Sequence, residues 1–263
     1  MDFNLAGKTA LITGGGSGLG LATAKNLNKE EVRTILFDKN FANFEGNDFA
    51  NKQLVKTVTG DVRNPEELAK LHQDLKTQNK SVDIIINCAG ITGAQGDFSD
   101  ISLEDWQEVF DINLFGSVNV TKEFLSDLQE KKWGRVLFLA SEDAMQPYDD
   151  EIPYCATKAG ILALSKGLAK TLGPQGITSN AVAPAFINTP MTDKMMQNRA
   201  DERNVSFDEA IQSFLKERRP FMTSSRRGYP EEVANVITFL CSEKASFVNG
   251  ANYRVDDNSV GTI

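Results

Sequence analysis

Thr13-Gly14-Gly15-Gly16-Ser17-Gly18-Leu19-Gly20 joins the apolar run Thr9–Thr13 to a helical pattern. In a strand–turn–helix unit of this kind, Gly14 permits the tight turn, Gly18 lets the backbone approach a pyrophosphate, and Gly20 lets the helix pack closely against the strand. The N-terminus of the helix then faces the anion. The loop lacks the Gly-Lys-Ser/Thr ending of a mononucleotide P-loop. A glycine-rich structural turn would show the same letters, so the loop by itself only favours a dinucleotide-binding site.

Strand-like and helical patterns alternate along the chain. The strand-like runs are Thr9–Thr13, Thr34–Phe37, Leu54–Val58, Val82–Asn87, Arg135–Ala140, Thr178–Ala183 and Asn252–Val255. The helical patterns are Leu19–Asn28, Pro65–Gln78, Leu103–Gln129, Pro153–Leu172 and Pro230–Cys241. Continuous apolar stretches are typical of parallel strands buried on both faces. The alternation predicts an α/β fold with a doubly wound parallel sheet, and we expect one domain over residues 1–263.

Two segments interrupt this alternation. Lys39–Gln53 lies where a crossover helix belongs, but its Asn, Gly and Asp content predicts a short or poor helix. Asn188–Tyr229 separates the sixth strand from the next helix and holds helical patterns at Met191–Arg199 and Phe207–Arg218. A long insertion after the carboxyl end of a strand is a common place for an active-site lid, so we expect a helical substrate lid over 188–229.

Asp38 ends the second strand about twenty residues after the glycine loop. An acidic residue at this place accepts hydrogen bonds from the adenosine ribose hydroxyls of NAD, whereas a 2′-phosphate there would be repelled. An aspartate in an ordinary turn is the alternative interpretation. Together with the loop, Asp38 predicts NAD as the cofactor.

Composition and charge exclude several classes of protein. The chain has 263 residues, of which 41% are hydrophobic and 24% charged, so it is neither disordered nor fibrous. Lys and Arg number 28 against 36 Asp and Glu, a formal net charge of −8. An acidic surface repels phosphate backbones and anionic headgroups, so we expect no nucleic acid and no membrane as partners.

Histidine and cysteine usage narrows the chemistry further. His72 is the single histidine, so a multi-histidine metal site is excluded, no metal is expected, and its helical run predicts a surface histidine. Cys88, Cys155 and Cys241 are odd in number and far apart, which indicates a reducing compartment. With no leader-like N-terminus and no run of ~18 apolar residues, we expect a cytoplasmic location.

Three motifs together resemble the signature set of the short-chain dehydrogenase/reductase family. They are Thr13-Gly14-xxx-Gly18-x-Gly20, Asn87-Cys88-Ala89-Gly90 and Tyr154-xxx-Lys158, in the family's order and spacing. The resemblance covers essentially the whole chain and implies a Rossmann fold, a nicotinamide cofactor and an oxidoreductase. It also implies a homo-oligomer, a dimer or a tetramer. Small residues in the Tyr154 helix (Ala156, Gly160, Ala163, Gly167) suit such an interface, although packing within one chain explains them nearly as well.

The resemblance also supplies cofactor contacts. Asp61 and Val62 resemble the adenine contacts, Asn87, Ala89 and Gly90 the turn that holds the ribose, and Ile187 and Thr189 the carboxamide anchors. The full expected set is Gly14, Gly16, Ser17, Gly18, Leu19, Gly20, Asp38, Asp61, Val62, Asn87, Ala89, Gly90, Tyr154, Lys158, Pro184, Ile187 and Thr189.

Tyr154 and Lys158 lie one helical turn apart, so their side chains share a face. A tyrosine with a pKa near 10 is a poor base at neutral pH. A lysine ammonium nearby, together with a positively charged nicotinamide, favours the phenolate and lowers the pKa of Tyr154. Tyr154 is then the expected acid or base for an alcohol proton. Seen alone, the pair could also be an amphipathic surface pair.

Two further residues match the family's catalytic set. Ser141 ends a buried run and resembles the serine that hydrogen-bonds the substrate oxygen. Asn113 resembles the asparagine whose helix kink holds a water that relays protons to the lysine, and asparagine is disfavoured inside a helix. The expected catalytic residues are therefore Asn113, Ser141, Tyr154 and Lys158.

Three places depart from the family pattern. The usual Pro-Gly after the sixth strand reads Pro184-Ala185, so that turn is not expected to need a positive φ. The usual Val-Asp-Gly-Gly near the C-terminus reads Val255-Asp256-Asp257-Asn258, and asparagine can adopt left-handed conformations. Ser141 is followed by Glu142 and Asp143, where small or apolar residues are common, and we expect Asp143 to face the substrate mouth. The expected substrate contacts are Ser141, Asp143 and Tyr154.

These inferences predict an NAD(H)-dependent oxidoreductase that interconverts a secondary alcohol and a ketone on a small polar substrate. The alternative is an NADPH-dependent 3-oxoacyl-(acyl-carrier-protein) reductase. Asp38 and the carboxylates near the mouth (Glu142, Asp143, Asp149, Asp150, Glu151) count against it, while Arg218, Arg219, Arg226 and Arg227 could offset that charge. A non-catalytic nucleotide sensor on the same fold is a second alternative, but no catalytic residue is missing.

Overall fold

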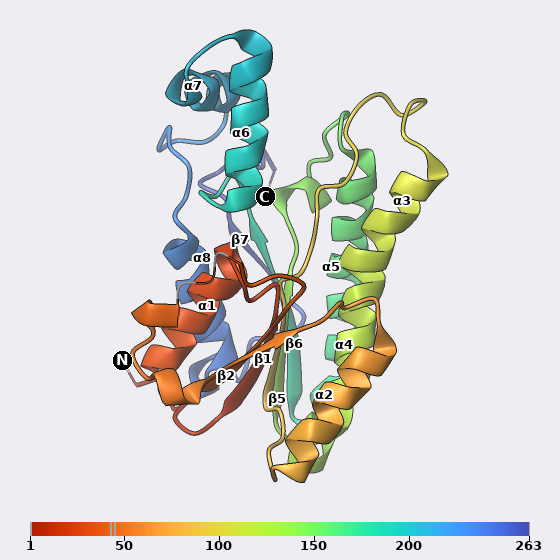
Figure 1. Ribbon diagram of the computed structural model, residues 1–263, viewed down its shortest axis with the longest axis vertical. Helices are drawn as coiled ribbons and strands as arrows, with labels where there is room; N and C mark the ends of the chain where they lie inside the picture. The colour runs from red at the N-terminus through yellow and green to blue at the C-terminus, as the bar shows by residue number, and fades with distance from the viewer. Residues whose placement is uncertain (1, 43, 45, 263) are drawn as a thin grey trace.

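The computed structural model describes residues 2–42, 44 and 46–262, and a parallel seven-stranded sheet runs through its centre (Figure 1). The strands are β1 (Thr9–Thr13), β2 (Arg33–Asp38), β3 (Val55–Thr59), β4 (Ile84–Asn87), β5 (Gly134–Leu139), β6 (Ile177–Pro184) and β7 (Asn252–Val255). Their order is β3-β2-β1-β4-β5-β6-β7, with every pairing parallel. The strand order reverses between β1 and β4, which is where ligands bind in doubly wound sheets. The predicted fold class is confirmed.

Helices cover both faces of the sheet (Figure 1). One face carries α1 (Gly18–Lys29) and α8 (Pro230–Cys241), and the other α2 (Pro65–Thr77), α4 (Gly116–Lys131) and α5 (Ile152–Leu172). Successive strand residues therefore enter different cores: Ile84 and Ile86 pack with Leu27, whereas Ile85 packs with Phe124. Burial on both faces explains the continuous apolar strands that identify the fold from sequence.

The helix expected over Leu103–Gln129 contains one irregular turn. It is built from α3 (Leu103–Phe110), a π-helical turn (Asp111–Phe115) and α4. Asn113 lies in that turn, and its amide pairs with the backbone of Ile91: Oδ1 accepts the Ile91 N–H at 2.9 Å and Nδ2 donates to the Ile91 carbonyl at 2.9 Å. The bulge thus directs a buried polar side chain at the loop after β4.

The two irregular segments fold largely as predicted. Within 39–53, the described residues form only short 3₁₀ turns at Gly46–Asp48 and Lys52–Leu54, while positions 43 and 45 lie outside the described residues. The 188–229 segment contains α6 (Pro190–Arg203) and α7 (Phe207–Arg218) at one end of the molecule (Figure 1). These two helices share a small apolar cluster of Phe186, Met196, Phe214 and Leu215.

The prediction of a surface histidine is wrong. His72 is 4% exposed. Its Nδ1 lies 2.8 Å from Glu123 Oε1 and its Nε2 lies 2.9 Å from Asp127 Oδ1, both on α4. His72 follows Leu68 by four residues and therefore shares the apolar face of α2 that packs against α4. The helical period, rather than the polarity of the residue, decides its burial.

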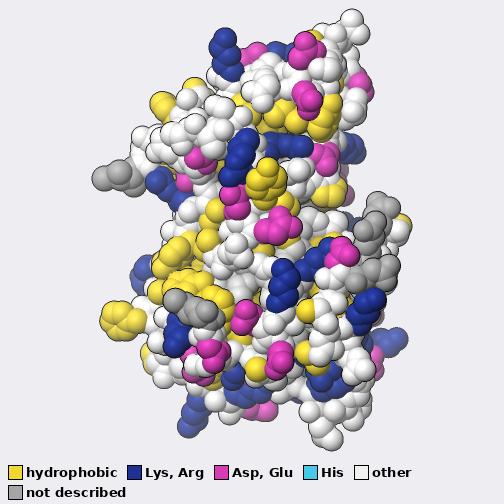
Figure 2. All heavy atoms as spheres, turned by 90° about the vertical axis from the view of Figure 1, so that its left-hand side faces the viewer, with side chains coloured by type: hydrophobic (Ala, Val, Ile, Leu, Met, Phe, Trp, Pro, Cys, Tyr) yellow, Lys and Arg dark blue, Asp and Glu magenta, His cyan; other side chains and the backbone are white. Residues whose placement is uncertain are grey.

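The face shown in Figure 2 carries mixed charge. On the side that bears α1 and α8, basic and acidic side chains are interspersed rather than gathered in fields of one sign (Figure 2). Cys88, Cys155 and Cys241 are free thiols. Among the described residues, no helix is long and apolar enough to span a bilayer, and no cluster of His, Cys, Asp or Glu could hold a metal ion.

Candidate active site

A cavity of about 630 Å³ opens at the carboxyl ends of the central strands. It extends from Asp38, which ends β2, past the glycine loop to Tyr154 and Glu151 at the start of α5. Helix α6 supplies part of its wall through Met191 and Met195. A cavity in this position suits an extended ligand that bridges the two halves of the sheet.

The glycine loop is held tightly against the next strand. Gly14 has φ +64°, and a Cβ there would lie 2.9 Å from the Ala89 backbone nitrogen. A Cβ on Gly20 would lie 2.2 Å from the Gly14 carbonyl oxygen. Both positions therefore require glycine, as the sequence predicts.

Thr13 Oγ1 accepts the N–H groups of Cys88 at 3.1 Å and Ala89 at 3.2 Å. Thr13 was absent from the predicted site, although a polar residue ending an apolar strand is a usable signal.

One end of the cavity is acidic but carries cations that are already engaged. Asp38 Oδ2 accepts the Gly16 N–H at 2.8 Å, which fixes the carboxylate beside the glycine loop. Asp61 Oδ2 binds Arg63 at 2.7 Å and Lys39 at 3.4 Å. The hydrogen bond from Arg63 holds the pKa of Asp61 at about 2. Lys39 and Arg63 are therefore both paired with Asp61.

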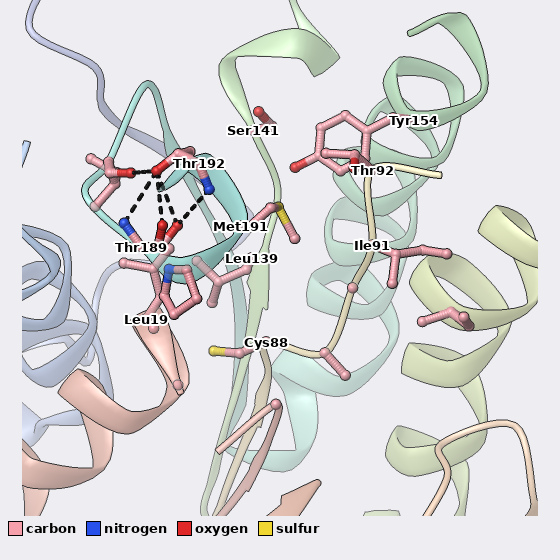
Figure 3. A pocket seen from close by; sticks show the side chains of 18 of the residues that line it. Leu19, Cys88, Ile91, Thr92, Leu139, Ser141, Tyr154, Thr189, Met191 and Thr192 are labelled. Atoms are coloured by element: carbon pink, nitrogen blue, oxygen red, sulfur yellow. Dashed lines mark hydrogen bonds between the residues drawn. The ribbon is translucent and has the colours of Figure 1, made fainter. Parts of the chain in front are cut away.

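The middle of the cavity is shaped by the turns after β4 and β6. A Cβ on Gly90 would lie 3.2 Å from Asn113 Oδ1 and 3.7 Å from Lys158 Nζ, so Gly90 leaves these polar atoms open to the cavity. Thr189 is the N-cap of α6, and Thr192 Oγ1 donates to the Ile187 carbonyl at 2.5 Å. Figure 3 shows these threonines grouped on one side of the pocket. Ala185 has no positive φ, as expected.

Ser141, Tyr154 and Lys158 meet at the far end of the cavity. Figure 3 shows Ser141, which follows β5, and Tyr154 of α5 beside the same hollow. Lys158 is 5% exposed, its Nζ donates to the Leu139 carbonyl at 2.7 Å, and it lies 5.4 Å from the centroid of the Tyr154 ring. Asn113 reaches the same helix, because its Nδ2 donates to Thr157 Oγ1 at 3.2 Å.

Burial controls the ionisation of both residues on α5. It lowers the pKa of Lys158 to about 8. It raises the pKa of Tyr154 above the ordinary value, and the carboxylate of Asp143 raises it further. The sequence predicted a lowered pKa for Tyr154. That prediction includes the positive charge of a bound nicotinamide; in the chain alone burial and the Asp143 carboxylate dominate, and the pKa is raised instead.

A buried carboxyl cluster adjoins Ser141 and Tyr154. Glu142 is 1% exposed and pairs with the Arg219 guanidinium, which comes from the end of α7. Ser141 Oγ lies 2.5 Å from Asp143 Oδ2. Glu151 accepts a hydrogen bond from Gln95 at 3.2 Å. Burial raises the pKa of Glu142 to about 7 and that of Glu151 to about 7. Asp143 lines the cavity as expected, but it is buried rather than open to solvent.

Most of the predicted site residues line this one cavity. Those that do are Gly14, Ser17, Gly18, Leu19, Gly20, Asp38, Asp61, Val62, Ala89, Gly90, Ser141, Asp143, Tyr154, Lys158, Pro184, Ile187 and Thr189. Gly16, Asn87 and Asn113 are buried and are not among the residues that line it. Asn87 is buried, with Nδ2 3.3 Å from Thr121 Oγ1 and no hydrogen-bond partner among the described residues for its Oδ1. The sequence did not place Gln95 or Thr192 at the site.

Comparison with known proteins matches nearly the whole chain. The family model described as enoyl-(acyl carrier protein) reductase matches residues 14–257. A 3-oxoacyl-(acyl-carrier-protein) reductase of Aquifex aeolicus is 35% identical over 95% of this chain and 96% of its own length. Dehydrogenase/reductase SDR family member 4 of Oryctolagus cuniculus is 28% identical, covering 94% of this chain and 91% of its own. The crystal structure of L-sorbose reductase from Gluconobacter frateurii, complexed with NADPH and L-sorbose, superposes with a TM-score of 0.90 at 28% identity and covers both chains fully.

Proposed function

This chain belongs to the short-chain dehydrogenase/reductase family of Rossmann-fold oxidoreductases, and we propose that it uses NAD(H) to interconvert a secondary alcohol and a ketone on a small polar substrate. The observation that carries the proposal is the meeting of Ser141, Tyr154 and Lys158 at the end of a cavity that begins at Asp38. The catalytic roles proposed for these residues and for Asn113 follow from that arrangement.

The residues present fit a nicotinamide dinucleotide. The glycine loop opens α1, whose N-terminal N–H groups favour an anion such as a pyrophosphate. Asp38 and Asp61 lie at the end where adenosine would lie, and Ile187 and Thr189 at the opposite turn. The buried Asn87 Oδ1 has no hydrogen-bond partner among the described residues and lies directly before the Cys88–Gly90 wall. A bound nicotinamide dinucleotide would supply the hydride acceptor in oxidation or the hydride donor in reduction.

The side chains at the Tyr154 end of the cavity have separate proposed roles. Tyr154 takes the alcohol proton in oxidation and returns it in reduction, while Ser141 hydrogen-bonds the substrate oxygen. Lys158 supports the phenolate by its charge. Asn113 fixes the loop at Ile91, against which this end of the cavity is built.

The carboxyl cluster supports a substrate rich in hydroxyl groups. Asp143 Oδ1 is buried in the cavity wall without a hydrogen-bond partner among the described residues, and Glu151 lines the same space. Carboxylates accept hydrogen bonds and repel anions. The structurally similar reductase that binds L-sorbose supports a neutral polyol or sugar in the same way. A panel of sugars, polyols and simple ketones, followed by the absorbance of reduced nicotinamide, tests the reaction. The absence of turnover with all of them, with either cofactor, would overturn it.

Asp38 is the residue we propose to select NAD. A 2′-phosphate would bring negative charge close to its carboxylate, and each pair of unit charges at ~4 Å costs roughly 4 kcal/mol at an effective dielectric of ~20. A tenfold preference needs only about 1.4 kcal/mol. Lys39 and Arg63 are paired with Asp61 rather than pointing to Asp38. We expect kcat/KM with NAD to exceed that with NADP by at least tenfold, and Asp38→Ala to narrow or remove the difference.

Lys39→Ala is the matched control for that experiment. It removes a neighbouring charge without touching the Asp38 carboxylate, so NAD should remain preferred in this variant. Relatives that reduce 3-oxoacyl groups and the NADPH-bound sorbose reductase make the measurement decisive. Equal or better wild-type rates with NADP would refute the assignment.

The second candidate is a 3-oxoacyl-(acyl-carrier-protein) reductase that uses NADPH, which the relative from Aquifex aeolicus favours. The arginines that could attract an acidic carrier protein are engaged within the chain. Arg218 pairs with Asp149 and Asp150, Arg219 with Glu142, Arg226 with Glu232 and Arg227 with Asp193. This pairing supports the small polar substrate over the carrier protein.

We also propose that 188–229 acts as a substrate lid and that the chain forms a homo-oligomer. Arg219 joins the end of α7 to Glu142, and Arg227 joins the following loop to Asp193 of α6 at 2.5 Å. Amide hydrogens of this segment should exchange faster in the free protein and become protected when cofactor and substrate bind together. Hydrogen-exchange mass spectrometry measures this, and equal protection in both states would contradict a lid.

A further inference from the structure

Ser141 makes a hydrogen bond whose direction has chemical consequences. Its Oγ lies 2.5 Å from Asp143 Oδ2, two residues along the same turn. A hydroxyl carries one proton, and an ionised carboxylate accepts hydrogen bonds but cannot donate them. When Asp143 is ionised, the Ser141 proton is therefore given to Asp143, and Ser141 faces the cavity only as an acceptor. When Asp143 is neutral, it can donate to Ser141, whose own proton is then free for the cavity.

We propose that Asp143 is a positioning residue whose proton decides whether Ser141 meets the substrate oxygen as a donor or as an acceptor. This inference rests on the proposed function, and it adds to that function a control of the reaction rate by the protonation state of one residue. A ketone oxygen needs a donor, so the neutral form of Asp143 suits reduction. In oxidation the alcohol gives its single proton to Tyr154, and its oxygen then needs the same Ser141 donor, so the neutral form of Asp143 supports both directions. The Asp143 proton is not consumed, because the proton that ends on the alcohol comes from Tyr154 and the electron pair arrives with the hydride.

The surrounding charges favour a retained proton at this cluster. The groups that face Asp143 come from its own turn, from the start of α5 and from the lid: Glu142, Tyr148, Glu151, Tyr154, Cys155, Lys158 and Arg219. Three carboxyl groups, those of Glu142, Asp143 and Glu151, thus face two cations, Lys158 and Arg219. Buried charges that are not compensated are costly, so one proton shared by the carboxyl groups lowers the free energy of the cluster.

Of the three carboxyl groups, Asp143 is the one whose proton bears on Ser141, because its Oδ2 lies 2.5 Å from Ser141 Oγ. Glu142 contacts the Arg219 guanidinium directly, and Glu151 accepts the Gln95 amide. Asp143 Oδ1 has no hydrogen-bond partner among the described residues, and Arg219 approaches it only to 3.8 Å. Its charge is therefore less directly compensated than that of Glu142, which contacts the guanidinium. Burial accordingly raises the pKa of Asp143.

The experiment compares Asp143→Asn and Asp143→Ala with the wild-type enzyme in both reaction directions across pH. The wild-type rate of ketone reduction should fall as Asp143 ionises with rising pH. The amide introduced by Asp143→Asn is a permanent donor, so this variant should stay within about threefold of the low-pH wild-type rate and lose that fall. Asp143→Ala removes the group and should reduce ketone about tenfold more slowly at every pH. An Asp143→Asn enzyme that retains the fall would overturn the proposal.

Two matched variants separate positioning from structure. Glu151→Gln removes a neighbouring negative charge without touching Ser141. The fall in the rate of ketone reduction with rising pH should therefore persist and move to lower pH. Ser141→Ala removes the group through which Asp143 acts, so adding Asp143→Asn to it should change the profile no further. Additive effects of the two substitutions would contradict the proposal, even if one single variant folds poorly.

A readout without turnover keeps this proposal distinct from the proposed reaction. Infrared absorption of the purified protein reports protonated carboxyl groups, and the band present at neutral pH should shrink in Asp143→Asn. If no alcohol or ketone reacts but the band behaves as expected, the proposed reaction fails and the proton on Asp143 stands. If turnover is found and the band is unchanged in Asp143→Asn, the positioning role of Asp143 is overturned.

Discussion

Tyr154→Phe should lower turnover by a factor on the order of 100 to 10,000, the usual contribution of a positioned acid or base. The substitution removes only the phenolic oxygen. Burial and Asp143 hold the pKa of Tyr154 above its ordinary value in the chain alone. Its role in oxidation therefore depends on positive charge from Lys158 and from the bound cofactor.

The measurement is kcat in both directions, with the dissociation constant of the cofactor determined separately by fluorescence titration. The dissociation constant should remain near the wild-type value. Tyr148→Phe is the matched control. The Tyr148 ring centroid lies 4.0 Å from Arg219 Cζ, and its hydroxyl accepts a hydrogen bond from Gln146 Nε2 at 3.1 Å, so this variant should change turnover only a few-fold. Turnover of Tyr154→Phe within a few-fold of wild type would remove Tyr154 from the role.

The fold could be predicted because each strand is buried on both faces. Runs such as Ile84–Asn87 and Gly134–Leu139 are almost wholly buried, and that burial leaves a continuous apolar signal in the sequence. Element ends were less accurate: the fourth strand starts at Ile84 rather than Val82. Residues at a strand end can leave the ladder at little cost, so their letters carry little information about it.

The glycine loop could be predicted because the constraint is local. Gly20 meets Gly14 within the same turn, and no side chain can be accommodated there. Contacts between distant segments carried no such signal. Arg219 reaches Glu142 across 77 positions, and only the packing of α6 and α7 brings the two together. The upward shift of the Tyr154 pKa could not be predicted for the same reason, because burial is a property of the folded chain.

The prediction that His72 lies on the surface failed for a different reason. Its polarity suggested the surface, yet Leu68, Leu71 and Leu75 already mark the buried face of α2, and His72 lies on that face. The π-helical turn at Asn113 was foreseen only as a kink implied by the family resemblance. Its cause is visible only in three dimensions, as the two hydrogen bonds between the Asn113 amide and Ile91.

Lys158→Met should lower turnover about 100-fold at neutral pH. The ammonium lies 5.4 Å from the Tyr154 ring centroid. At an effective dielectric of ~20 that separation corresponds to about 3 kcal/mol between unit charges, or roughly 2 pKa units on the phenol. Methionine has a similar length and no charge. The rise of the oxidation rate with pH should therefore move upward by about 2 pH units in the variant. Cofactor affinity should also fall, since Lys158 is one of the expected cofactor contacts.

Unfolding measurements distinguish this loss from structural damage. Burial lowers the pKa of Lys158 from its ordinary 10.5 to about 8. The charged form is thus disfavoured in the folded state at neutral pH by roughly 3 kcal/mol. This cost is present below pH 8 and disappears as pH rises through 8 toward 10.5, where the unfolded chain also loses the proton.

Methionine removes that cost but leaves the Leu139 carbonyl without its 2.7 Å donor, which costs about 1–3 kcal/mol. The two terms nearly cancel, so the free energy of unfolding at pH 7 should stay the same or rise slightly, although catalysis collapses. Urea titration of wild type and Lys158→Met at pH 7 measures this. A large loss of stability together with the lost activity would mean that Lys158 supports the fold rather than the phenolate. Wild-type turnover in a stable variant would remove it from the mechanism altogether.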